Sequence, residues 1–89
     1  MYSNEFMREA LAFAKTLGYG IRYEWFGGSG GGSCEFNGSK WIYIDLALNA
    51  VDQCDQLIHC LRHDSQLSNV TIPAMLQRHL RPQTRHQAA

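Results

Sequence analysis

His59 and His63 are the residues of this chain whose types and spacing most directly suggest chemistry. Because they are four positions apart, they lie on one face of a helix, where two imidazoles can bind one metal ion. Cys60 follows His59, at the position where zinc peptidases with this spacing carry a glutamate that acts as general base. A thiol cannot accept and return that proton as a carboxylate does. We therefore expect no ordinary zinc hydrolysis and assign no catalytic residue.

The two histidines belong to a predicted helix over residues 49–64. Asn49 is a suitable N-cap, and Asp52 can complete a capping box and complement the helix dipole. The apolar stripe of this helix consists of Val51, Cys54, Leu57, Ile58 and Leu61. His59 and His63 fall nearly opposite the stripe, and Cys60 is also expected to point away from the core. Solvated surface residues are therefore the plain alternative to metal ligands.

Two more helices are expected at the ends of the domain. Ser3 can cap a first helix over residues 4–17, and Gly18 is placed for a left-handed C-cap. A last short helix can start at Ser68 or Thr71, with Pro73 in its first turn. The apolar side chains expected to pack inward from this last helix are Met75, Leu76 and Leu80.

Three strands are predicted between the first two helices. Residues 20–26 alternate apolar and polar, residues 33–36 form a short strand, and residues 40–46 are rich in β-branched and aromatic side chains. Asn37 and Gly38 suit a type I′ turn, which needs positive φ at both positions. We therefore predict a three-stranded antiparallel meander with residues 20–26 and 40–46 at its edges. Trp25 and Phe26 lie on opposite faces of their strand, so one of them is expected to be exposed and available to a partner.

The glycine-rich segment over residues 27–33 joins two of these strands. A phosphate-binding loop would open a helix and, in the P-loop case, carry a lysine before Ser or Thr. This segment has neither feature, so we interpret it as a flexible hairpin connection.

The order of elements over residues 10–63 resembles the core of the ImmA/IrrE-type metallopeptidases, a small zincin-like fold. The similarity is carried by LGYGIRYEWF at the end of the first helix, a glycine-rich hairpin, the strand WIYIDLAL, and NAVDQCDQLIHCLRH in place of the active-site helix. The resemblance implies that His59 and His63 are zinc ligands. The family's third ligand comes from a following helix, commonly as Glu, and His79 is the residue that can take this place. The catalytic Glu is replaced by Cys60, and the Gly usual before the second His by Arg62.

Length and composition set further bounds. The 89 residues, 45% hydrophobic and 18% charged, predict one globular domain over residues 1–80 and a flexible basic tail over residues 81–89. The formal charge is zero, which argues against a nucleic-acid partner, and no segment has transmembrane length. An odd number of cysteines, three, and a start without secretory features favour free thiols and a cytoplasmic protein.

We therefore predict an α+β domain with an N-terminal helix, a three-stranded antiparallel meander, a central helix and a short C-terminal helix, like a zincin core without its catalytic apparatus. The favoured function is a non-enzymatic protein interaction module without a cofactor. Its partner would be a protein, a peptide or a second copy of the chain, bound near Trp25 and Phe26, because the aromatic side chains exceed what so small a sheet can bury. The alternative is a metal-dependent peptidase or hydrolase, with zinc on His59, His63 and His79.

Overall fold

The computed structural model describes residues 3–80. The chain forms helix α1 (Asn4–Thr16), strands β1 (Tyr19–Glu24), β2 (Gly32–Phe36) and β3 (Ser39–Asp45), and helix α2 (Ala50–Arg62). Two 3₁₀ turns (Leu67–Asn69 and Ala74–Leu76) then lead to the short helix α3 (Gln77–Leu80). The α+β class and this order of helix, strands, helix and short helix are confirmed. The basic tail predicted over residues 81–89 lies outside the described residues.

The sheet is mixed, so the predicted antiparallel meander is wrong. The strand order is β1-β3-β2, with β1 parallel and β2 antiparallel to β3. The Asn37–Gly38 turn, with φ of 54° and 79°, places β2 beside β3 as expected. β3 takes the centre because Ile42 and Ile44 are fully buried, whereas the short polar β2 is better suited to an edge. The edges are therefore β1, as predicted, and β2 in place of residues 40–46.

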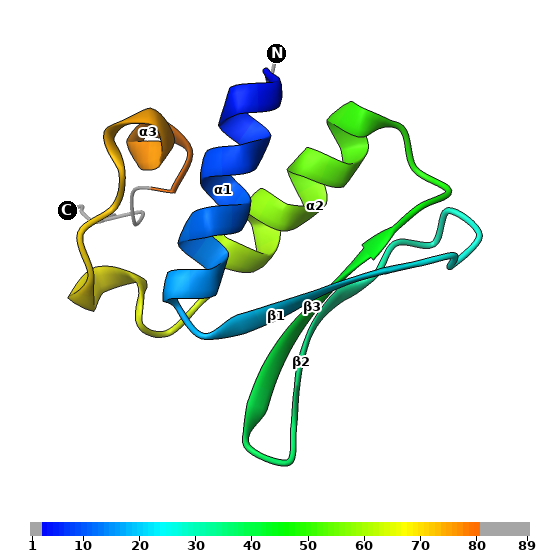
Figure 1. Ribbon diagram of the computed structural model, residues 1–89, viewed down its shortest axis with the longest axis horizontal. Helices are drawn as coiled ribbons and strands as arrows, with labels where there is room; N and C mark the ends of the chain where they lie inside the picture. The colour runs from blue at the N-terminus through cyan, green and yellow to red at the C-terminus, as the bar shows by residue number, and fades with distance from the viewer. Residues whose placement is uncertain (1–2, 81–89) are drawn as a thin grey trace, which may run out of the picture.

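Helices α1, α2 and α3 lie on one face of the sheet (Figure 1). The buried face of β3 packs against α2, and α1 packs against β1 and α2. Helix α3 packs against α2, and the 3₁₀ turn before it packs against α1. The buried side chains are Phe6, Ala10, Phe13, Ala14, Leu17, Ile42, Ile44, Cys54, Leu57, Ile58, Cys60, Leu61, Leu67, Leu76 and Leu80. Val51 and Met75, both predicted to face the core, are exposed because each lies in the first turn of its element. None of the helices in residues 3–80 has the length and apolar character needed to cross a membrane.

The helix ends follow the capping residues named from the sequence. The Ser3 hydroxyl accepts a hydrogen bond from the Phe6 amide at 3.0 Å, and Oδ1 of Asn49 accepts one from the Asp52 amide at 2.8 Å. Each bond satisfies an amide that has no partner inside the helix. Gly18 has φ of 96°, the left-handed conformation that ends α1 and turns the chain into β1.

Candidate functional site

The histidine pair lies on the solvent side of α2. His59 and His63 are both exposed, and their ring centroids are 4.5 Å apart with an angle of 45° between the planes. Nδ1 of His63 lies 2.9 Å from the backbone oxygen of His59. Because a carbonyl oxygen only accepts hydrogen bonds, this nitrogen is the donor, and Nε2 faces away from the bond. The structure therefore brings the two imidazoles together as the spacing predicts.

His79 does not join this pair. Its ring packs edge-on against Phe6, with the centroids 5.0 Å apart, and its backbone oxygen accepts two hydrogen bonds from Arg62, at 3.0 and 2.8 Å. Within residues 3–80, no three side chains of the types His, Cys, Asp or Glu are grouped so that they could hold a metal ion. The residues present in this part of the chain therefore do not fit the three-ligand zinc site that the resemblance implies.

Cys60 points into the core, so the prediction that it faces away from the core is wrong. Its side chain is 6% exposed and contacts the apolar cluster, because β2 lies against α2 and widens the buried face of the helix. Burial raises the pKa of the Cys60 thiol, and a hydrogen bond with Ser33 only partly offsets this effect. A buried, protonated thiol is neither a good nucleophile nor a base. Cys60 is therefore part of the packing between α2 and the sheet.

Asp45, which we did not single out from the sequence, organises the glycine-rich loop. Its fully buried carboxylate accepts hydrogen bonds from the backbone amides of Phe26 (3.0 Å), Gly28 (2.9 Å), Gly30 (3.0 Å) and Ala47 (2.9 Å). Burial by itself raises the pKa of Asp45, but these four bonds outweigh it and hold the pKa below the ordinary value. The segment is therefore a crossover from β1 to β2 clamped on the end of β3, not the flexible hairpin expected from its composition.

The clamp also holds Phe26, the second of the two aromatic residues that follow β1. Phe26 donates its amide to Asp45 and packs edge-on against Tyr43, with the ring centroids 6.1 Å apart. Trp25 is 74% exposed and Phe26 37% exposed, so the expected exposure applies to both residues and most strongly to Trp25. Within β1 itself, Tyr23 is 46% exposed. Three of the exposed aromatic side chains in residues 3–80 thus lie at one end of this edge strand, and another, Phe36, is 67% exposed at the end of β2.

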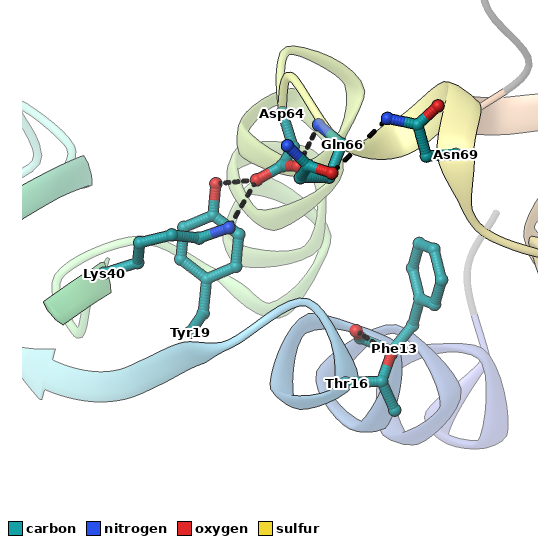
Figure 2. Close-up of polar contacts among 7 residues, drawn as sticks. All are labelled: Phe13, Thr16, Tyr19, Lys40, Asp64, Gln66 and Asn69. Carbon is teal, nitrogen blue, oxygen red and sulfur yellow. Dashed lines mark hydrogen bonds and ion pairs between the residues drawn. The ribbon is translucent and has the colours of Figure 1, made fainter.

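A polar cluster joins the start of β1, the start of β3 and the end of α2 (Figure 2). Oδ2 of Asp64 accepts hydrogen bonds from the Tyr19 hydroxyl at 2.5 Å and from Nζ of Lys40 at 3.0 Å, and Oδ1 accepts the Gln66 amide at 2.7 Å. Nζ of Lys40 also lies 4.4 Å from the centroid of the Tyr19 ring. The cluster borders an open polar pocket of about 480 Å³.

These contacts set the protonation states of the cluster. Burial alone raises the pKa of Asp64, but the bonds from Tyr19, Gln66 and Lys40 outweigh it and hold the pKa below its ordinary value. Burial and the neighbouring carboxylate raise the pKa of the Tyr19 hydroxyl. Because the charged and hydroxyl groups of the cluster bind one another, the arrangement joins three elements and offers no activated group. Sequence reasoning missed it because the bond from Tyr19 to Asp64 spans 45 residues.

The outer edge of β1 combines exposed aromatic surface with charges of both signs. Within residues 3–80, β1 pairs with β3 alone, so in this part of the chain its other side presents unpaired strand backbone. Arg22 and Glu24 are exposed on the face away from the helices, where the Arg22 guanidinium lies 5.4 Å from the centroid of the Trp41 ring. Together with Tyr23 and Trp25, these residues form what we call the β1 edge. It is the candidate binding site of the described chain.

Comparison with models of protein families, with curated proteins and with solved structures finds no match to this chain. The resemblance to ImmA/IrrE-type metallopeptidases therefore stays a prediction made from the order of its elements.

Proposed function

We propose that the protein is a non-enzymatic interaction module that binds an extended polypeptide segment as an added strand along the β1 edge. The observation that carries this proposal is an open strand edge with two strongly exposed aromatic residues, Tyr23 at 46% and Trp25 at 74%. Backbone bonds to an edge strand supply affinity, and side chains next to it supply specificity. Exposed aromatic side chains are typical of protein–protein contacts.

The chemistry-bearing residues support a binding role rather than a catalytic one. Asp45 is saturated by backbone amides, and Asp64 is shared between Tyr19, Lys40 and Gln66. The Cys60 thiol is buried and its pKa is raised. In this proposal each of these groups stabilises the fold. The free thiols suit the cytoplasm, the compartment that we propose for it.

The alternative, a metal-dependent hydrolase, has one observation in its favour, the adjacent rings of His59 and His63. His79 lies against Phe6 and does not complete a ligand set with them. The position of the catalytic glutamate is occupied by the buried Cys60. We therefore favour the interaction module.

A peptide titration tests the proposal. The probe is an acetylated and amidated heptapeptide with the sequence of residues 20–26, added to isotope-labelled protein at low protein concentration. We expect amide chemical-shift changes confined to β1 and the residues next to it, because an added strand bonds to the open backbone. The matched control is the same peptide N-methylated at alternate residues, on the side that would donate hydrogen bonds. Shifts that are absent, that lie elsewhere, or that survive N-methylation would contradict strand addition at β1.

A further inference from the structure

The pattern of charges along β1 identifies a partner for the β1 edge. Arg22 and Glu24 lie on the open face, on either side of Tyr23, which points to the helix side. Within residues 3–80 the one ion pair joins Lys40 and Asp64, so Arg22 and Glu24 are not paired with an opposite charge there. Glu24 is the sheet neighbour of Asp45, another carboxylate, so a cation beside Glu24 would be favourable.

We propose that β1 pairs antiparallel with β1 of a second copy of this chain, about a twofold axis at Tyr23. The inference rests on the proposed function, since it names the strand that the β1 edge binds. In this register Arg22 faces Glu24 of the second copy and Glu24 faces its Arg22. Opposite charges that face each other across antiparallel strands are stabilising. The product is a continuous six-stranded sheet, β2-β3-β1 followed by the same strands in reverse order.

The faces of the sheet restrict the register. Residues directly opposite each other in an antiparallel pair point to the same face. If the helices of both copies lie on the same side of the sheet, odd-numbered residues must face odd-numbered residues and even-numbered ones even-numbered ones. A register shifted by one residue would place the helices on opposite sides. Registers centred on Arg22 or on Glu24 place like charges opposite each other, and one centred on Ile21 leaves Arg22 opposite Gly20. Only the register centred on Tyr23 pairs both charges with their opposites.

Apolar contacts agree with the same register. Tyr23 faces its own copy across the axis, which covers a ring that is 46% exposed in the single chain. Ile21, half-buried on the helix side, comes opposite Trp25, the most exposed of the large apolar side chains in residues 3–80. Edge strands are usually kept from pairing with other chains by lysine, proline or a bulge. Residues 19–24 contain neither lysine nor proline.

The other edge, β2, does not offer the same match. Its one charged residue is Glu35, and this strand carries no cation. Self-pairing of β2 about Cys34 would place Glu35 opposite Ser33 in both halves, with no charge to attract it. Glu35 also faces Lys40 of its own chain across the β2–β3 ladder. The self-complementary edge is therefore β1.

Charge exchange tests the dimer and its register. Arg22→Glu and Glu24→Arg each turn two attractive pairs into two repulsive ones, so each variant alone is expected to raise the dimer dissociation constant about tenfold or more. An equal mixture of the two variants places opposite charges together again and is expected to recover the wild-type constant. The doubly exchanged protein, Arg22→Glu with Glu24→Arg, is expected to do the same. Sedimentation equilibrium gives the constants, and thermal melts confirm that each variant is folded.

A crosslink provides an independent readout. In a Cys34→Ser background, Tyr23→Cys places two thiols face to face at the proposed axis and is expected to give an intermolecular disulfide under mild oxidation. Glu24→Cys is the matched control, because its thiol faces position 22 and not itself. Equal crosslinking of both variants, or no recovery in the mixture, would overturn the register. A monomeric wild type that still binds the heptapeptide would overturn the dimer alone, whereas failure to bind the peptide as well would overturn the proposed function.

Discussion

The hydroxyl of Tyr19 donates a hydrogen bond of 2.5 Å to Oδ2 of Asp64, which follows it by 45 residues. This bond joins the first residue of β1 to the segment just after α2, so it connects an early part of the chain to a late one. Lys40 binds the same oxygen at 3.0 Å, so the pair is held from a third element, β3. A single carboxylate therefore links the sheet to the end of the second helix.

Removing the Tyr19 hydroxyl is expected to destabilise the protein. Tyr19→Phe should lower the free energy of unfolding by about 1 to 3 kcal/mol, because Asp64 loses a hydrogen bond to its charged form in a largely buried setting. Chemical denaturation provides the measurement. Tyr23→Phe is the matched control, since the Tyr23 ring is exposed, and it should change stability by less than about 0.5 kcal/mol. Equal effects of the two variants would show that the bond contributes nothing of its own.

The same pair makes stability depend on pH at both extremes. The pKa of Asp64 is below its ordinary value of 3.8, so its contribution is present above that value and is lost as the pH falls through the folded-state pKa. The pKa of Tyr19 is above its ordinary value of 10.0, so its contribution is present below pH 10.0 and declines as the pH rises. In Tyr19→Phe, the melting temperature should fall less steeply than in the wild type as the pH is lowered into the acid range. It should also fall less as the pH is raised above 10. Unchanged profiles in this variant would contradict the assignment.

The thiols are expected to react in two classes. All three cysteines are free in the structure, as predicted, with Cys34 exposed and Cys54 and Cys60 buried. Burial, aided by Asp55, raises the pKa of Cys54 to about 11, and burial also raises that of Cys60. A thiol reagent should therefore modify one cysteine quickly in the native protein and all three after denaturation. Rapid native modification of Cys60, identified by mass spectrometry, would contradict its place in the core.

The histidine pair is expected to contribute little to stability. His59→Ala with His63→Ala should change the free energy of unfolding by less than about 0.5 kcal/mol, because both rings are exposed. His79→Ala provides the contrast, with an expected loss of about 1 kcal/mol, because its ring packs against Phe6. Stoichiometric zinc in protein purified without a histidine tag, or a large loss of melting temperature on chelation, would contradict the surface interpretation.

The sequence predicted what local interactions determine. Ser3, Asn49 and Gly18 mark helix ends through contacts within a few residues, and Asn37 with Gly38 determines a turn by backbone preference alone. The strand order could not be predicted in this way, because it depends on which strand the helices bury, and that is determined by packing of the whole core. The burial of Cys60 was missed for the same reason, since it depends on the contact between β2 and α2.

The Asp45 clamp shows where a sequence signal was present but not used. Asp45 ends a buried strand, and its carboxylate can accept hydrogen bonds from backbone amides. The amides of Gly28 and Gly30, which we expected to bind solvent, donate to it. The glycine run was interpreted through its flexibility. Its amides bind Asp45, and its lack of side chains is also required, because Gly27, Gly28 and Gly30 have φ of 69°, 87° and 85° and a Cβ at Gly31 would overlap the backbone oxygen of Tyr43.

The parallel pairing of β1 with β3 also has a consequence for the order of events during synthesis. β1 leaves the ribosome before β3. Its residues Tyr19 to Glu24 therefore cannot form their strand pairs until residues Lys40 to Asp45 have been synthesised. The β2–β3 hairpin can close locally, so we expect it to form first and to act as the template on which β1 assembles. Gly38→Ala, which strains the turn at φ of 79°, should then slow folding more than it speeds unfolding. Until that template exists, the nascent chain carries an aromatic strand with both edges open.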